Sequence, residues 1–277
     1  MNSEPLNAVT EEDKAVYQRD GVVCLRQMFD SEWIQLLKSH IEDVRKAPED
    51  FGVTGPSHSA GMISVCYMWR KPGPVRDFIM QSPLGQIVGE TIGADFIRIY
   101  HDHLFVKPPQ SPKIMPWHND ESAWPVKGEM APNIWVALDP VSSENGRVEF
   151  LAGYHKHCIE NDIHYGFAPD QGAGLCPNFE EERNNPGFPF EFVGFDMQPG
   201  DAVIFHPMTP HFSKGNFSET LPRSGLAVRV FGNDVTWWNT PYKAPIPDVT
   251  DLPEGKAPEG EYFPVIWEKP SAKSHAA

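Results

Sequence analysis

Up to about residue 95, the apolar residues of the chain are spaced mainly as in helices. Thr10, which precedes three acidic residues, is typical of a helix N-cap, and Gly21 marks the end of the helix that it begins. After Asp30, a second such cap, apolar residues recur every three or four positions. The pattern therefore predicts helices over 14–20, after Asp30 and over 83–92, a strand over 22–25 and a loop over 46–62.

From Phe96 onward, short apolar runs alternate with turns rich in proline and glycine, which predicts a β sandwich or barrel. The stretch 163–195 is rich in Gly, Pro, Asn and acidic residues and is expected to be a long insertion that could serve as a lid. We expect one domain over 1–277, with a helical flank at about 10–95, a β core at about 96–236 and a proline-rich C-terminal wrap at about 237–277. The strands are predicted over 96–107, 133–138, 148–151, 202–206 and 225–231.

Charge and composition narrow the class of protein further. The 277 residues include 23 Lys+Arg against 38 Asp+Glu, so the formal net charge is −15. This charge argues against a nucleic-acid partner, which needs a basic face, and against a polybasic membrane anchor. No apolar stretch is long enough to span a bilayer and no signal peptide is visible, so we expect a cytoplasmic protein with a small-molecule substrate. The sequence leaves the oligomeric state open.

A histidine and a carboxylate, His118 and Asp120, lie two positions apart. On a strand, both side chains would point to the same face and could bind one metal ion. His211 is the best candidate for a third ligand, because it follows a Pro-Gly-Asp turn and an apolar strand. Two histidines and one carboxylate form the facial triad that leaves coordination positions open on Fe(II). We therefore predict a mainly β fold, a double-stranded β-helix (jelly roll) with flanking N-terminal helices, and an iron site at its mouth.

The segments around these three residues follow a characteristic order. They are Tyr-Gln-Arg-Asp-Gly-Val-Val at 17–23, Trp-His-Asn-Asp at 117–120, Ile-Trp-Val-Ala-Leu-Asp at 134–139, Glu-Asn-Gly at 144–146, Leu-Ala-Gly-Tyr-His-Lys at 151–156, Gly-Asn at 215–216 and Pro-Arg at 222–223. Together they resemble the phytanoyl-CoA dioxygenase-like family of Fe(II)/2-oxoglutarate-dependent oxygenases, over about residues 13–267. The resemblance implies that His118, Asp120 and His211 are catalytic iron ligands. It also implies hydroxylation of an unactivated C–H bond, with 2-oxoglutarate and O2 as co-substrates and release of succinate and CO2.

The same resemblance implies residues that bind 2-oxoglutarate. Arg223, in the matching Pro-Arg dipeptide, is the implied anchor, since a guanidinium can bind the distal carboxylate through two hydrogen bonds. Arg229 is the alternative anchor, because it has the same strand parity. Lys107 ends a strand as in similar members and is implied to contact 2-oxoglutarate, unless it only extends to solvent at that strand end. Asn133 and Trp135 share a strand face and are expected to line the pocket.

The substrate is expected to be a small polar metabolite, and the overall resemblance suggests 2-aminoethylphosphonate, hydroxylated at the carbon next to phosphorus. Two other classes of protein remain as alternatives. The first is a cupin-type metal enzyme that does not use 2-oxoglutarate and binds its metal through His101, His103 and His211. The second is a non-catalytic binding module that keeps the fold but holds no metal.

Overall fold

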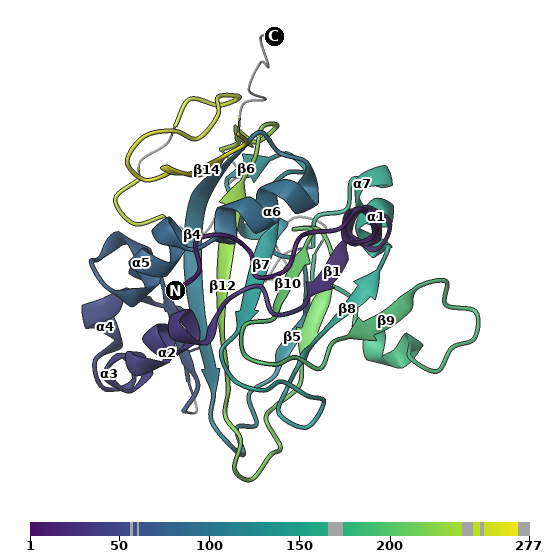
Figure 1. Ribbon diagram of the computed structural model, residues 1–277. Coiled ribbons are helices and arrows are strands. Elements are labelled where there is room, and N and C mark those ends of the chain that lie inside the picture. Colours follow the sequence, from purple (N-terminus) through teal and green to yellow (C-terminus); the bar gives the residue numbers. More distant parts are fainter. Residues whose placement is uncertain (56–57, 60, 166–173, 240–245, 250–251, 271–277) are drawn as a thin grey trace.

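Two antiparallel sheets form the centre of the computed structural model, which describes the chain except for residues 56–57, 60, 166–173, 240–245, 250–251 and 271–277 (Figure 1). The larger sheet has the strand order β1-β10-β7-β12-β4-β3-β2, with β14 paired to β4, and the smaller sheet has the order β5-β11-β8-β9. β13 and β6 form a separate pair. The strands are β1 (Val22–Leu25), β2 (Val53–Thr54), β3 (Ile63–Cys66), β4 (Phe96–Lys107), β5 (Met115–His118), β6 (Val126–Lys127), β7 (Asn133–Ala137), β8 (Val148–Ala152), β9 (Glu191–Gly194), β10 (Ala202–Phe205), β11 (His211–Ser213), β12 (Arg223–Phe231), β13 (Thr236–Trp237) and β14 (Val265–Glu268).

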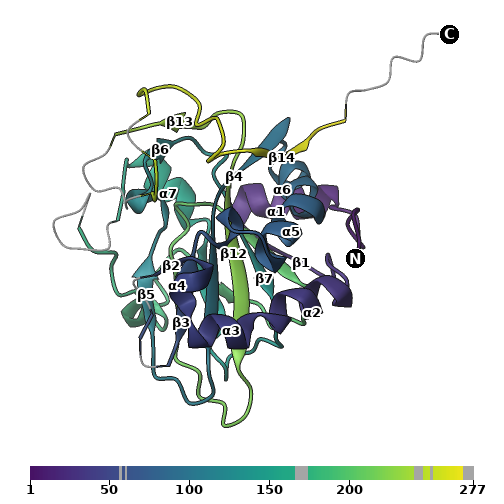
Figure 2. The same ribbon diagram turned by 90° about the vertical axis from the view of Figure 1, so that its left-hand side faces the viewer.

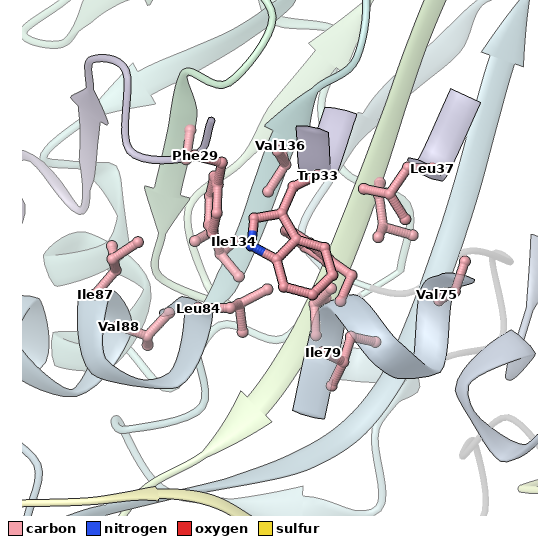
Figure 3. Packing of buried hydrophobic residues seen from close by; sticks show 14 of the residues in the cluster. Phe29, Trp33, Leu37, Val75, Ile79, Leu84, Ile87, Val88, Ile134 and Val136 are labelled. Atoms are coloured by element: carbon pink, nitrogen blue, oxygen red, sulfur yellow. The ribbon is translucent and has the colours of Figure 1, made fainter. Parts of the chain in front are cut away.

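Helices cover the face of the larger sheet that points away from the smaller one. Figure 2 shows α1, α5 and α6 on one side of β12, with β5 on the other side. In Figure 3, side chains of α2, α5 and α6 surround Ile134 and Val136 of β7. The helices are α1 (Glu11–Asp20), α2 (Ser31–Ser39), α3 (Ile41–Lys46), α4 (Pro48–Phe51), α5 (Pro74–Gln81), α6 (Leu84–Ile92) and α7 (Tyr154–Glu160), with 3₁₀ turns η1 (Met68–Arg70), η2 (Glu121–Ala123) and η3 (Phe179–Glu182).

Side chains alternate between the two faces of β7 and β12, and this alternation positions the candidate site. On β12, Leu226, Val228 and Val230 join the core under the helices. Ala227 and, on β7, Trp135 instead join a second core between the two sheets. Because successive side chains of a strand point to opposite faces, the odd-numbered residues of β7 and β12 face the space between the sheets. The prediction of a mainly β jelly-roll core with N-terminal helices is confirmed.

Most of the predicted elements are present, with some differences at their ends. The helix after Thr10 has a complete capping box, in which the Thr10 hydroxyl accepts from the N–H of Asp13 and the Asp13 carboxylate accepts from the N–H of Thr10. The helix after Asp30 ends at Ser39, so Ile41 belongs to a separate short helix. The loop expected over 46–62 is partly wrong, because it contains α4 and β2. β3 and α5 were not predicted.

The long insertion contributes to the smaller sheet through β9, which pairs with β8. It also contains η3, whereas residues 166–173 lie outside the described part of the chain. Its role as a lid and the single-domain boundaries remain predictions. Near the C-terminus, β14 pairs with β4 and extends the larger sheet at one end, beside α6 (Figure 1). Among the described helices, none is long and apolar enough to cross a membrane.

Candidate metal centre

Three buried side chains converge between the two sheets. His118 is the last residue of β5, His211 is the first residue of β11, and the two are directly paired across the strands with ring centroids 4.1 Å apart. Oδ1 of Asp120 lies 3.6 Å from Nε2 of His118 and 3.9 Å from Nε2 of His211. In the part of the chain that the structure describes, this is the one group of three or more His, Cys, Asp or Glu side chains whose ligand atoms all lie within 4.8 Å of one another.

Asp120 reaches the site by a route that differs from the sequence-based argument. β5 ends at His118, and Asp120 has helical backbone angles (φ −83°, ψ −29°) at the N-cap of η2. The chain turns here because the N–H groups of Asp120 and Glu121 both donate to the carbonyl of Pro207, at 3.0 and 3.2 Å. A turn, and not the parity of a strand, therefore places the carboxylate beside the two imidazoles.

Backbone carbonyls hold both imidazoles in the orientation that metal binding requires. Nδ1 of His118 donates to the carbonyl of Pro116 (2.7 Å), and Nδ1 of His211 donates to the carbonyl of Thr209 (3.0 Å). With Nδ1 protonated, Nε2 of each ring carries the lone pair and faces Asp120. Burial lowers the pKa of His118, and burial together with the nearby His118 lowers the pKa of His211 to about 3. Both rings are therefore neutral at pH 7, the form that binds a metal.

Asp120 is held as an anion with one oxygen directed at the histidines. Its other oxygen, Oδ2, accepts from Nδ2 of Asn133 (2.8 Å) and from Nη2 of Arg229 (3.3 Å). Burial raises the pKa of Asp120, but Arg229, the two histidines and the Asn133 hydrogen bond outweigh this effect and keep the pKa below its ordinary value. Two neutral imidazole nitrogens and one carboxylate oxygen are the donor set of the facial triad, so the residues present fit an Fe(II) ion.

A pocket opens beside the triad, and the residues predicted to bind or line it lie around it. His118, His211, Asn133, Trp135, Arg223 and Arg229 all belong to its lining. Trp135 lies over Gly225 so closely that a Cβ on this glycine would be 1.9 Å from the indole. Sequence reasoning missed Ser213, which also lines the pocket; its position two residues after His211 on the same strand was the available signal.

Arg223 is a buried cation with donors left for a ligand. It is 2% exposed, its Cζ lies 5.6 Å from the Trp135 ring, and burial lowers its pKa to about 10, so it is charged at pH 7. Among the described residues, its hydrogen bond runs from Nε to the carbonyl of Gly146 (3.2 Å). Arg229, the alternative anchor, instead donates to Asp120. The two arginines therefore make different hydrogen bonds, and the choice of Arg223 as the anchor for 2-oxoglutarate remains a prediction.

Lys107 is fully buried, so the alternative of a lysine that extends to solvent is wrong. It pairs with Arg223 across β4 and β12, and its Nζ donates to Oγ of Ser213 (2.8 Å) and to the carbonyl of Lys214. Burial, reinforced by the charge of Arg223, lowers the pKa of Lys107 to about 6. These bonds join the end of β4 to the end of β11 beside the pocket.

The alternative ligand set of a cupin does not form in the described part of the chain. Nε2 of His103 is hydrogen-bonded to Oγ of Ser64 (2.7 Å), and the His101 ring stacks on Tyr67 with centroids 5.1 Å apart. Neither ring joins His211 in a group that could hold a metal. The prediction that rests on His101, His103 and His211 is therefore wrong.

A double-stranded β-helix with a buried His-Asp-His group is typical of non-haem Fe(II) oxygenases. The model of the phytanoyl-CoA dioxygenase family matches residues 17–225. The chain therefore belongs to the phytanoyl-CoA dioxygenase family, and the predicted resemblance is confirmed.

Curated relatives agree with this assignment, and solved structures share the fold. The phytanoyl-CoA dioxygenase domain-containing protein 1 homolog of Caenorhabditis briggsae is 26% identical over 107 residues, 38% of this chain and 36% of that protein, so the chain spans about a third of the length of this relative. The peroxisomal phytanoyl-CoA dioxygenase of Homo sapiens is 24% identical over 231 residues, 76% of this chain and 65% of that protein. The non-haem α-ketoglutarate-dependent carbocyclase SnoK from nogalamycin biosynthesis has a TM-score of 0.74 at 20% identity, over 96% of this chain and 99% of that chain. The epimerase SnoN in complex with Fe3+, α-ketoglutarate and nogalamycin RO has a TM-score of 0.74 at 18% identity, over 93% of this chain and 98% of that chain.

Proposed function

We propose that the protein is an Fe(II)/2-oxoglutarate-dependent dioxygenase that hydroxylates a C–H bond of a small polar metabolite. The observation that carries this proposal is the convergence of Nε2 of His118, Nε2 of His211 and Oδ1 of Asp120 beside a pocket with a buried arginine. Membership of the family supports the reaction class, and the Fe3+ and α-ketoglutarate in the SnoN structure support the cofactors. When bound, iron and 2-oxoglutarate would supply the activation of O2, with succinate and CO2 as by-products.

The residues of this chain have separate tasks in the proposed enzyme. His118, Asp120 and His211 hold the metal on one face and leave the pocket side open. Arg223 binds the distal carboxylate of 2-oxoglutarate, for which its buried charge and free Nη groups are suited. Trp135 shields this ion pair from water, and Lys107 with Ser213 closes the end of the pocket behind it.

The identity of the substrate is a separate proposal, more specific than the reaction class. We propose 2-aminoethylphosphonate, hydroxylated at the carbon next to phosphorus, as the first compound to test. This proposal rests on the sequence resemblance alone. The cytoplasmic location and the absence of a nucleic-acid partner remain predictions from composition.

The test is an anaerobic titration of the protein with Fe(II) and then 2-oxoglutarate, which follows the visible charge-transfer band of the ternary complex. We expect the band in the wild-type protein and its loss in Asp120→Ala. Arg223→Gln should still bind Fe(II) but need a much higher concentration of 2-oxoglutarate, because it lacks the charge that binds the distal carboxylate. Succinate release with 2-aminoethylphosphonate then tests the substrate.

Two results would contradict the proposal. Iron that binds without any response to 2-oxoglutarate would favour a metal enzyme that uses no such co-substrate. A protein that binds no divalent metal would favour the binding module. Arg183→Gln serves as a control for Arg223→Gln, because this arginine pairs with Glu149 and Glu180 outside the pocket lining and should leave the response to 2-oxoglutarate unchanged.

A further inference from the structure

Two polar side chains next to the candidate metal centre lack hydrogen-bond partners that buried groups normally have. Arg229 is 7% exposed, and its Nε and Nη1 have no partner among the described residues. His101 is 9% exposed, and neither of its ring nitrogens makes a hydrogen bond within the described part of the chain. Since buried donors are almost always satisfied, both side chains are available to a group that accepts hydrogen bonds.

The strand geometry brings these two side chains together. Arg229 and His101 are directly paired across β12 and β4, and the register shifts immediately after them, because the partner of Val230 is Ile99. This irregularity leaves Tyr100 without a counterpart on β12 and turns His101 into the space between the sheets. Arg229 lines the same pocket as His118 and His211. The two side chains therefore lie on the metal side of the larger sheet.

Aromatic rings hold His101 in place. Its ring stacks on Tyr67 and meets Tyr100 and Trp124 edge-on, with centroids 4.5 and 6.5 Å away. Tyr67 has a left-handed backbone (φ 59°), which is uncommon for a residue other than glycine. The turn that follows is fixed by the Asp102 carboxylate, which accepts from the N–H groups of Met68 (3.1 Å) and Trp69 (2.9 Å). Such strain, held by its surroundings, is typical of functional sites.

The carboxylates near Arg229 use their oxygens elsewhere and leave its Nε and Nη1 without an acceptor. Asp120 accepts from Nη2 of Arg229 through Oδ2 and directs Oδ1 at the two histidines. Asp102, whose charge also acts on Arg229, accepts from the N–H groups of Met68 and Trp69. Glu121, the buried carboxylate beside Asp120, is paired with His164 at 2.6 Å. The remaining donors of Arg229 therefore favour an acceptor that a ligand supplies.

We propose that Arg229 and His101 bind an anionic oxyacid group of the primary substrate. This inference rests on the proposed function and adds the substrate class to it. A carboxylate and a phosphonate share the required chemistry, because each presents several acceptor oxygens and a negative charge. Arg70 adds positive charge nearby, since its guanidinium lies 4.9 Å from the ring of Tyr67, on which His101 stacks.

The test measures binding and does not depend on turnover. Protein loaded anaerobically with Fe(II) and 2-oxoglutarate is titrated in a calorimeter with methylphosphonate, with propanoate and with the uncharged propanamide. We expect saturable binding of at least one acid and none of propanamide, and the two acids distinguish a phosphonate site from a carboxylate site. Arg229→Gln and His101→Phe should each raise the Kd of that acid at least about tenfold, as expected for the loss of a charge-assisted hydrogen bond. His101→Phe keeps the aromatic stacking, and Arg229→Lys should have an intermediate Kd.

His103→Phe is the matched control. This histidine lies two positions from His101 on the same strand and is also buried, but it is bonded to Ser64, so the Kd of the acid should change by no more than about twofold. The inference is overturned if neither acid binds, if propanamide binds equally well, or if Arg229→Gln and His101→Phe bind the acid like the wild-type protein. Failure of the charge-transfer band to form would instead overturn the proposed function. The same titrations on protein without 2-oxoglutarate would then still test Arg229 and His101.

Discussion

Asp120 uses its two carboxylate oxygens for different purposes. Oδ1 faces His118 and His211, while Oδ2 is held by Asn133 and Arg229. Partners of this kind fix the direction of a ligand before the metal arrives, and their loss weakens metal binding even though the ligands remain. Asn133 therefore belongs to the metal centre and is more than a residue of the pocket wall.

Replacement of Asn133 by leucine should weaken metal binding without removing a ligand. We expect the Kd for Fe(II), or for Mn(II) as an oxygen-stable probe, to rise about 10- to 100-fold, the usual effect of losing such a partner. Anaerobic calorimetry measures the change. Asn178→Leu, at an exposed asparagine before η3, is the control and should bind metal like the wild-type protein. Equal affinities in the two variants would show that Asn133 does not orient Asp120.

At this scale, the sequence predicts the three candidate ligands but not their supporting contacts. His118 and Asp120 are close in the chain, so any local turn or strand brings them together. The hydrogen bond from Asn133 joins β7 to the turn before η2, and it depends on the packing of two sheets. Short-range spacing carries no information on such a contact.

At the scale of elements, β7 and β12 pack closely because a large side chain on β7 lies over a glycine on β12. Trp135 occupies the space over Gly225, and this places the indole between Arg223 and the core that the two sheets share. Volume added at Gly225 would displace the indole, because protein interiors are too closely packed to absorb it.

Gly225→Ala should therefore destabilise the protein and disturb the pocket together. We expect the free energy of unfolding to fall by about 1–3 kcal/mol, the usual cost of overpacking. The affinity for 2-oxoglutarate should fall as well, because Trp135 packs against Arg223. Urea unfolding and the anaerobic titration measure the two effects. Gly187→Ala, where an added Cβ would meet only Asn185 at 3.3 Å, should change stability by less than about 0.5 kcal/mol.

The elements that sequence reasoning missed lack strong local signals. β3 has only four residues, is buried along its whole length and shows no alternation. α5 begins at Pro74, a residue that fits the first turn of a helix but is also common in loops. The longer strands were predicted because runs rich in β-branched and aromatic residues lie between turns rich in proline and glycine. The pairing of β11 with β5 could not be predicted, since each is short and its partner lies far away in the chain.

At the scale of the whole molecule, the interior contains several histidines that must stay neutral. His206 is 5% exposed and lies beside His155, with ring centroids 5.1 Å apart. Burial, together with the nearby His155, lowers the pKa of His206 to about 3. In the unfolded chain a histidine has a pKa near 6.5, so between about pH 6.5 and 3 the unfolded state binds more protons. The stability contributed by neutral His206 is complete above about pH 6.5 and is lost as the pH falls.

His206→Gln should make the protein less sensitive to acid. One such histidine lowers the free energy of unfolding by about 1.4 kcal/mol for each pH unit below 6.5, so the wild-type protein should lose about 2 kcal/mol more than the variant between pH 7 and pH 5. Urea unfolding of metal-free protein at the two pH values measures the difference. Glutamine keeps an acceptor for the N–H of Met208, which bonds Nδ1 of His206 in the wild-type protein. Equal losses of the free energy of unfolding in the two proteins would contradict the lowered pKa of His206.

The order of strands in the larger sheet has a consequence for the synthesis of the protein. β1 leaves the ribosome about 180 residues before its partner β10, and β7 is enclosed only after β12 has also emerged. The nascent chain therefore carries unpaired strand edges while these residues are made, and folding that depends on such distant pairings is slow. Expression at lower temperature, or with more chaperone, should therefore raise the yield of native protein.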